Sequence, residues 1–318
     1  MRTTIAQATA VLLLGLAAVW PGPAAAADTS WTVRTASNDF GADRPNYGYT
    51  VDPGGRLTDG LVVANPGTTP LHLAVYTADA LTTEDGRLDL AAKDTRPAAV
   101  GAWVHTERPE VTIPPGGSAE VPFTVTPPED AAPGEYMGGI VTSLAQAGEA
   151  DTGRRLGIRI RLRVGGALKP GLSVENPRVR YSGTPNPFGK GEATVTYTIR
   201  NTGNAILTAR QTVSVSGPFG GPGVRAGQIG DSPQLLPGGA WHVSVPVHGV
   251  APALRLTGTI NLVPLLTDAA NSISPLTAVE STADTWTVPW TLPLLLVVLC
   301  GLVVVSRRFW KQRRVNGQ

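Results

Sequence analysis

The chain of 318 residues contains a single cysteine and only four histidines. One cysteine excludes an internal disulfide framework, and the scattered histidines show no zinc-ligand spacing. No P-loop, Gly-x-Ser-x-Gly elbow or paired-carboxylate motif occurs. The sequence therefore predicts a protein that is not an enzyme and has no cofactor or metal site, although a triad assembled in space remains the alternative.

A large excess of one charge is also missing. The chain has 26 Lys and Arg against 24 Asp and Glu. Six of the cations lie close to its ends: Arg2, Arg307, Arg308, Lys311, Arg313 and Arg314. Without them, 20 cations face 24 acids, a net charge of about −4. Because nucleic-acid-binding domains are usually basic, we expect no nucleic-acid partner.

The first 27 residues have the order of a secretory signal peptide. Arg2 supplies one charge, residues 10–19 are apolar, and a Pro-Gly-Pro break precedes three alanines that end at Ala27. The apolar run is shorter than a membrane-spanning helix needs. We therefore predict export, with cleavage after Ala27.

A second apolar run, residues 286–305, has 20 residues without a charge. About 20 such residues let a helix cross the hydrocarbon core. Trp286 and Trp290 stand where an outer aromatic belt is expected, and the cluster of cations follows the run. The positive-inside rule then makes residues 306–318 a basic cytoplasmic tail. We predict a single-pass membrane protein with its N-terminus outside; the alternative is a buried core helix with a solvated tail.

Between its ends the chain repeats a series of turns. The stretch VVANPGTTPLHLAV around Asn65 returns 136 residues later as YTIRNTGNAILTA around Asn201. IPPGGSAEVPFTV, with Gly116, returns as LLPGGAWHVSVPV, with Gly238. We predict that each pair occupies equivalent turns in two related domains.

The segments between these turns alternate apolar and polar residues, which is typical of strands with one buried face. Short strands separated by Gly, Pro and Asn turns predict an all-β chain with two tandem immunoglobulin-like β-sandwiches. We place them at residues 28–166 and 167–266, because the first copy lacks a last strand unless it includes LGIRIRLRV. The polar, weakly patterned residues 267–285 are predicted to form a stalk.

The turn motifs of the first domain follow a particular order. NYGYTVDPGG is followed by the Asn65 turn, the DALTTEDG segment, a second Pro-Gly turn and PGEYMGGI. Over about residues 31–166 this series resembles the extracellular peptidoglycan-binding domain of the WxL-interacting proteins. In that family a second immunoglobulin-like domain, one membrane helix and a basic tail follow. The resemblance implies a bacterial cell-surface protein, anchored in the cell membrane, that contacts cell-wall peptidoglycan and partner surface proteins.

Three arginines on one strand face, Arg159, Arg161 and Arg163, are the candidate binding residues. Such a face suits an anionic wall polymer or lipid headgroups; a solvated face that blocks edge-to-edge pairing is the alternative. Tyr47 and Tyr49 are candidates for stacking on sugar rings, although aromatic residues of a sandwich more often belong to its core.

The segment DALTTEDGRLDL contains acidic residues that could bind calcium, but their spacing differs from that of an EF-hand loop. Counted from Asp79, Gly86 falls at position 8, whereas an EF-hand needs glycine at position 6. The Asp-Gly pair favours a hairpin turn. The predicted function is therefore non-catalytic binding at the cell surface through the first sandwich. The alternative is a passive structural ectodomain or spacer of a membrane complex, without wall affinity of its own.

Overall fold

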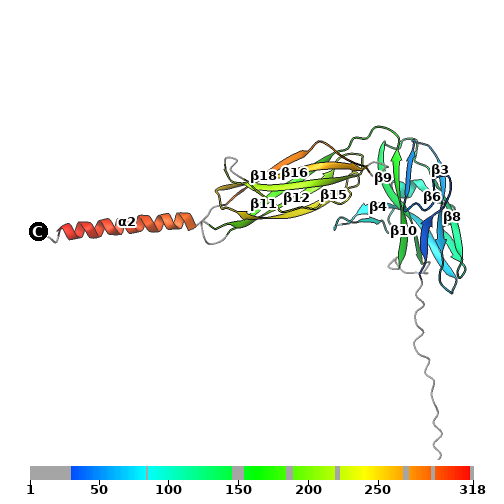
Figure 1. Ribbon diagram of the computed structural model, residues 1–318, viewed down its shortest axis with the longest axis horizontal. Coiled ribbons are helices and arrows are strands. Elements are labelled where there is room, and N and C mark those ends of the chain that lie inside the picture. The colour runs from blue at the N-terminus through cyan, green and yellow to red at the C-terminus, as the bar shows by residue number, and fades with distance from the viewer. Residues whose placement is uncertain are drawn as a thin grey trace, which may run out of the picture.

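A computed structural model describes residues 30–83, 85–144, 154–183, 189–218, 223–267, 272–287 and 291–315 (Figure 1). Within these residues the only helices are a short one, α1 (Val100–Trp103), and a long one, α2 (Thr291–Val315). The rest of the regular structure is strand, so the prediction of an all-β chain is confirmed. The predicted signal peptide lies outside the described residues.

The first half of the chain builds two facing sheets. One has the order β1 (Thr32–Thr35), β3 (Leu57–Ala64), β8 (Ser118–Val125), β6 (Val104–Thr106). The other has the order β2 (Tyr47–Val51), β10 (Arg155–Val164), β9 (Gly134–Leu144), β4 (Leu71–Thr82), β5 (Leu88–Leu90), and β7 (Glu110–Ile113) also pairs with β4. The β2–β10 pair is parallel. Alternate residues of both sheets, such as Leu61, Phe123 and Ile160, are fully buried in one core. We call this body the first sandwich.

The second half repeats the plan around a separate core. One sheet has the order β11 (Leu172–Ser182), β12 (Gly191–Asn201), β15 (Ala240–Val250). The other has the order β14 (Val224–Arg225), β13 (Leu207–Ser216), β16 (Arg255–Thr267), β17 (Ile273–Pro275), and β18 (Val279–Trp286) also pairs with β16. Ile199, Leu207 and Ile260 are among the buried side chains between these sheets. We call this body the second sandwich.

The Asn turns of the two sandwiches have the same hydrogen bonds. Asn65 Nδ2 donates to the carbonyls of Thr69 (2.8 Å) and Ile113 (3.1 Å), and its Oδ1 accepts from the Gly67 N–H (3.0 Å). In the second sandwich, Asn201 Nδ2 donates to the carbonyls of Ala205 (2.7 Å) and Leu235 (2.8 Å), and its Oδ1 accepts from the Gly203 N–H (3.0 Å). Each buried amide thus ties its own turn to a distant strand end. The predicted equivalence of Asn65 and Asn201 is confirmed.

The Pro-Gly-Gly turns match as well. Gly116 has φ 67° and Gly238 has φ 76°, left-handed values at which a side chain is strained. The glycine that follows each donates its N–H three residues back, Gly117 to Pro114 and Gly239 to Leu236. In both sandwiches a further backbone hydrogen bond joins the Asn turn to the Pro-Gly-Gly turn. The Asn65 N–H donates to the Gly117 carbonyl, and the Asn201 N–H donates to the Gly239 carbonyl, both at 2.9 Å.

The predicted stalk is wrong. Strand β16 continues to Thr267, and β18 covers residues 279–286 in antiparallel register with it. Val279 and Ala283 of β18 face inward against the second core, whereas Glu280 and Asp284 face outward. The inward positions are small or weakly apolar, so their alternation did not stand out in the sequence. The second sandwich therefore extends beyond residue 266, to Trp286.

Helix α2 begins at Thr291, five residues after the expected start, because Trp286 ends β18. The helix also includes the basic segment up to Val315. It lies beyond the end of the second sandwich that is remote from the first (Figure 1). No helix within the described side chains meets the length and hydropathy required for a membrane span.

Candidate functional site

Strand β10 carries the predicted arginine face, and the structure divides its residues into two kinds. Ile158, Ile160, Leu162 and Val164 point into the first core. The arginines lie on the opposite face of the strand. Arg155 bonds Asp89 at 2.8 Å and Arg161 bonds Glu135 at 2.7 Å. Arg159 and Arg163 are exposed, and within the described residues neither has a hydrogen-bond or ion-pair partner. With Arg155 included, this face of β10 therefore has two arginines in ion pairs and two without a counter-charge.

Arg161 belongs to the junction between the sandwiches and not to a free surface. Its guanidinium donates to the carbonyl of Thr267 (2.9 Å) as well as to Glu135. Glu135 is buried and accepts a hydrogen bond from the N–H of Ile206 (2.8 Å). This ion pair thus joins β9 and β10 of the first sandwich to two segments of the second. As a binding candidate Arg161 is already occupied.

Asn204 completes the junction. Its side chain donates to the carbonyls of Pro133 (2.8 Å) and Ala167 (3.1 Å) and accepts from the Lys169 N–H (2.6 Å). Its backbone carbonyl accepts from the Glu135 N–H (2.8 Å). One side chain therefore holds the linker after β10, the loop before β9 and the second sandwich together.

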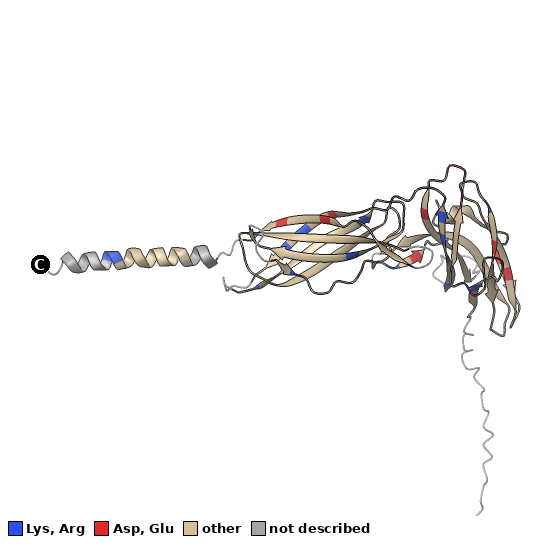
Figure 2. Cartoon of the chain, turned by 45° about the horizontal axis from the view of Figure 1, so that its top comes forward, with Lys and Arg blue, Asp and Glu red and all other residues tan. Residues whose placement is uncertain are grey.

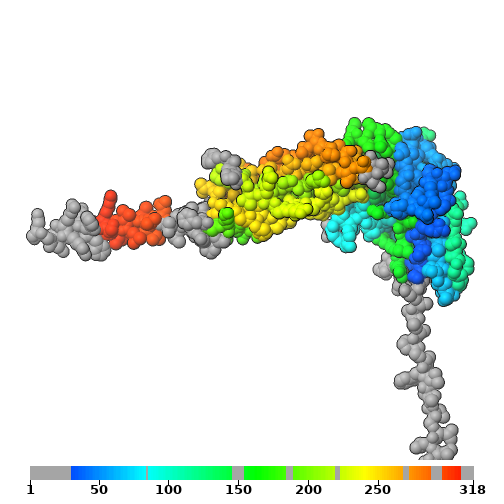
Figure 3. Space-filling model, in the orientation of Figure 1, coloured from blue at the N-terminus to red at the C-terminus, as the bar shows by residue number. Residues whose placement is uncertain are grey.

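A hairpin between β4 and β5 forms one wall beside β10. The Thr83 N–H bonds the Arg87 carbonyl (2.8 Å) and Gly86 has φ 79°, so the prediction of a turn at Asp-Gly is confirmed. Leu90 fills a notch that two glycines open: a Cβ at Gly139 or Gly157 would lie 2.7 or 2.9 Å from Leu90 Cδ1. The hairpin projects beneath the second sandwich (Figure 3).

The tip of this hairpin lies against the second sandwich. A Cβ at Gly86 would lie 2.6 Å from Pro233 Cγ and 3.1 Å from Trp241 Nε1. Together with the Arg155–Asp89 ion pair, this contact fixes the hairpin at both ends. A pocket of about 260 Å³ results between hairpin and sheet. It is lined by Ala80, Leu88, Asp89, Leu90, Val141, Arg155, Gly157 and Arg159.

Tyr47 and Tyr49 are core residues. They are 1% and 6% exposed, so neither ring has a free face for a sugar; the core interpretation holds and sugar stacking by these rings is excluded. Strand β2 carries them parallel to β10. Their hydroxyls donate to the Gly60 carbonyl (2.7 Å) and to Asp59 Oδ2 (2.5 Å).

Asp59 is the centre of a buried polar network that the sequence analysis missed. Its carboxylate accepts from Arg44 Nη1 (2.7 Å), from Asn38 Nδ2 (2.6 Å) and from Tyr49. Burial alone raises the pKa of Asp59, but hydrogen bonds from Arg44, Tyr49, the Gly60 N–H and Asn38 outweigh burial and lower the pKa below its ordinary value. Burial and this carboxylate raise the pKa of Tyr49 in turn. The Asp59 carboxylate is buried, whereas Asn38 is exposed and Arg44 is partly exposed, so the network reaches from the core to the surface and serves the fold.

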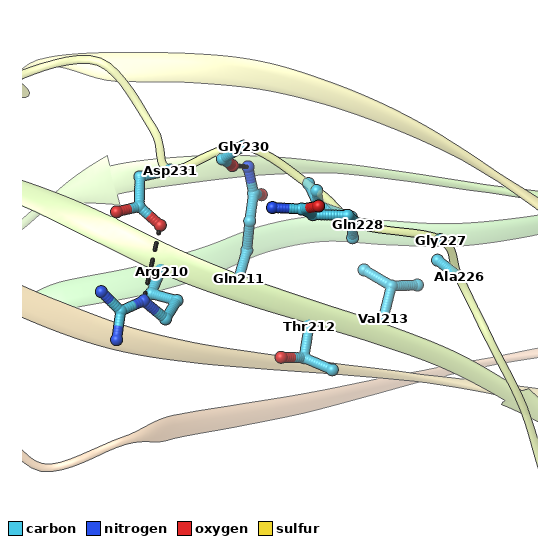
Figure 4. A pocket seen from close by; sticks show the side chains of 10 residues that line it. Arg210, Gln211, Thr212, Val213, Ala226, Gly227, Gln228, Gly230 and Asp231 are labelled. Carbon is cyan, nitrogen blue, oxygen red and sulfur yellow. Dashed lines mark hydrogen bonds and ion pairs between the residues drawn. The ribbon is translucent and has the colours of Figure 1, made fainter.

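A larger cavity, about 570 Å³, lies on the second sandwich between β13 and residues 226–231 (Figure 4). Gln211 crosses it, because its Nε2 donates to the Gly230 carbonyl (2.8 Å) while its Oε1 accepts from the Tyr197 hydroxyl (2.6 Å). Arg210 pairs with Asp231 at 3.6 Å at one side. The lining residues include one carboxylate, Asp231, and one hydroxyl, Thr212, but no imidazole.

The remaining candidates have local structural roles. Asp79 accepts from the N–H groups of Ala98 (2.6 Å) and Gly101 (2.7 Å), so it holds the segment before α1. His72 contacts Thr112 and His242 contacts Thr198. Within the described residues no group of three or more His, Cys, Asp or Glu could hold a metal ion. Lys, Arg, Asp and Glu are interspersed over both sandwiches (Figure 2).

Comparison with known proteins identifies no family. No family model matches the chain, and no curated protein matches it. Among solved structures, a chaperone–tip adhesin complex of CFA/I fimbriae biogenesis aligns at 10% identity and a TM-score of 0.41, covering 80% of this chain and 98% of that one. The Escherichia coli chaperone DraB aligns at 14% identity and a TM-score of 0.34, covering 80% and 96%. The Pseudomonas aeruginosa chaperone CupB2 aligns at 11% and 0.32, covering 76% and 98%. Scores this low support no functional inference.

Proposed function

We propose that this protein is a non-catalytic binding protein of the bacterial cell surface, anchored in the cell membrane. Its two β-sandwiches are immunoglobulin-like domains in tandem, and the first contacts peptidoglycan or an anionic wall polymer, or a partner surface protein. The observation that carries this proposal is the pair of uncompensated arginines on β10, Arg159 and Arg163. Isolated exposed cations attract polyanions at long range, and the attraction weakens as salt rises.

The order of turn motifs in the first sandwich supports the same role through its resemblance to the WxL-interacting proteins. The two turn types that carry the resemblance, around Asn65 and Gly116, are bonded to each other in the fold. They are therefore parts of one structural unit and not independent coincidences. We infer an outer sandwich that binds and an inner sandwich that positions it.

Anchoring by the C-terminal segment is supported by apolar exposure. Leu296, Val297, Leu302 and Val304 of α2 are each more than half exposed, and the cluster of cations follows. An apolar helix without protein partners suits a lipid environment. The sandwiches then lie outside the cell membrane, and the basic residues lie in the cytoplasm. Protease added to intact cells should remove both sandwiches, and their protection would contradict this topology.

The binding role is tested by retention of the detergent-solubilised chain on purified cell wall. The double variant Arg159→Gln/Arg163→Gln should be retained severalfold less than wild type at low salt, and the difference should vanish at high salt. Arg161 is left intact, since replacing it would disturb the junction. The matched control, Arg56→Gln/Arg108→Gln, removes two exposed arginines elsewhere on the first sandwich. Equal retention of both double variants would exclude the β10 face.

A spacer without wall affinity is the alternative function. The hydrogen-bonded junction at Glu135, Arg161 and Asn204 favours it, because two sandwiches in a fixed arrangement set a distance from the membrane. If the intact chain binds neither wall material nor any surface protein, the spacer role is supported and the binding role is excluded.

A further inference from the structure

We propose that the pocket beside Arg159 binds an anionic group, a carboxylate or a phosphate, carried on a short aliphatic chain. The inference rests on the proposed wall-binding role only for the source of the anion; the pocket itself can be tested with small molecules.

The charge balance around the pocket lacks one anion. Of the acids on the adjoining strands, Asp89 is paired with Arg155 and Glu135 with Arg161. Asp79 of β4 is bonded instead to backbone N–H groups of Ala98 and Gly101. The guanidinium of Arg159 has no such partner in the described chain. Asp85, at the hairpin tip, is paired with Arg87. A bound anion would therefore supply a counter-charge that the protein itself does not provide.

The backbone register places no charged residue beside Arg159. On β9 the residue directly opposite Arg159 is Gly139, and Leu90 covers the space above this glycine. On the other side, the pairing of β10 with β2 begins only at Ile160. Arg163, by contrast, lies directly opposite Glu135. Two arginines of this face line the recess, Arg155 and Arg159. Arg155 is paired with Asp89, so Arg159 supplies the uncompensated charge there.

The walls of the recess determine which anions fit. Leu88, Leu90, Ala80 and Val141 make one side apolar, and the volume of about 260 Å³ is small. A guanidinium binds carboxylate or phosphate through two parallel hydrogen bonds, and partial exclusion of water strengthens them. An aliphatic stem attached to the anion can then cover the leucines. A bare ion would leave that apolar surface wet.

The walls are preformed, so binding needs no rearrangement. The hairpin is held by the Arg155–Asp89 ion pair, by Leu90 in its glycine notch and by the contact of Gly86 with Pro233 and Trp241. A fixed pocket loses less conformational entropy on binding than a flexible one.

The experiment is calorimetric titration of the full chain in detergent with four probes: butyrate, butyl phosphate, acetate and the neutral isostere butyramide. Butyrate or butyl phosphate should bind, acetate should bind more weakly, and butyramide should not bind measurably. Arg159→Gln should weaken binding by about tenfold or more, since it removes a charged hydrogen-bond donor. Arg108→Gln, the matched control, removes an exposed arginine elsewhere on the first sandwich and should leave binding unchanged. Leu88→Ala should weaken butyrate more than acetate.

The outcomes separate the possibilities. Equal loss in Arg159→Gln and Arg108→Gln would mean diffuse attraction and would overturn the pocket, as would equal binding of butyramide or no binding of any probe. A preference for butyrate points to a peptide or uronate carboxylate, and a preference for butyl phosphate to a wall or lipid phosphate. If the probes bind but the double variant Arg159→Gln/Arg163→Gln is retained on wall as well as the wild type, the pocket stands and the proposed wall role of β10 fails. Thermal unfolding of each variant verifies that it is folded.

Discussion

The two sandwiches share one set of turns but differ in the elements that are added to them. Both tie an Asn turn to a Pro-Gly-Gly turn with matching hydrogen bonds. Both also finish with a strand that pairs antiparallel with an earlier one, β10 with β9 and β18 with β16. The first sandwich adds the β4–β5 hairpin and α1 within the same frame, and its last strand carries arginines where β18 carries small and polar residues. The shared part determines the fold, and the added parts create the pocket.

The buried polar groups differ in the same way. The first sandwich encloses a charged pair, Arg44 and Asp59. The second encloses the neutral pair of Tyr197 and Gln211, joined at 2.6 Å. A buried carboxylate stabilises a fold only while it is ionised and fully hydrogen-bonded, so the two sandwiches should respond differently to acid and to the loss of one partner.

The largest expected effect is on the first sandwich alone. Asp59→Asn should destabilise it by about 3 kcal/mol, because the substitution removes the buried member of the ion pair and leaves the partly buried Arg44 without its counter-charge. Hydrogen exchange measured by mass spectrometry can follow each sandwich separately. Protection of β3 and β8 should fall, while that of β12 and β15 should not. An equal loss in both sandwiches would contradict their energetic independence.

The same residue predicts an acid response. The pKa of Asp59 is lower in the folded protein than its ordinary value of 3.8. Its contribution to stability is therefore complete above pH 3.8 and is lost as the pH falls through the lower, folded-state value. Acid should weaken exchange protection in the first sandwich more than in the second, and Asp59→Asn should reduce this difference. The unchanged pH dependence of that variant would contradict the assignment.

Asn65→Ala and Asn201→Ala should each cost about 2–3 kcal/mol, because each removes the hydrogen bonds of its amide to two carbonyls and one glycine N–H. Each substitution should act on its own sandwich, and the two losses should agree within about 1 kcal/mol. Urea titration read by hydrogen exchange measures both. Thr68→Ala, on the exposed side of the Asn65 turn, is the control and should change little. A loss from only one asparagine would show that the turns are alike in geometry but not in energy.

The junction provides a smaller effect. Glu135→Gln should cost about 1–2 kcal/mol, since it replaces a charged partner of Arg161 with a neutral one. It should also broaden the distribution of distances between spin labels placed on the two sandwiches. A distribution as narrow as that of the wild type would assign the rigidity to Asn204.

Alternation and turn chemistry predicted much of this fold from the sequence. Strands such as β12 and β15 have a clear period of two, and Asn-x-Gly and Pro-Gly-Gly turns have characteristic local hydrogen bonds. Strand β18 was missed because its inward positions, Val279, Ser281 and Ala283, are small or polar. The pairing of Arg161 with Glu135 across 26 residues, and that of Asn204 with Pro133 across 71, depend on tertiary contacts that no local pattern reports. For the same reason the sequence could present three arginines as one face, but could not show that only two of them are free.

The smallest effect isolates the backbone contribution to the repeat. Gly116 and Gly238 have similar left-handed φ angles, and a Cβ at either position would have no atom within 4 Å. Replacement by alanine therefore creates no clash, and its cost is the strain of the left-handed conformation, about 1 kcal/mol. Gly116→Ala and Gly238→Ala should lower the stability of their own sandwiches by equal amounts, measured by urea titration. The Asn variants instead remove hydrogen bonds in addition to any backbone effect. If the two alanine costs differ by more than the measurement error, the turns relax differently, and the repeat is then conserved in hydrogen bonding but not in backbone strain.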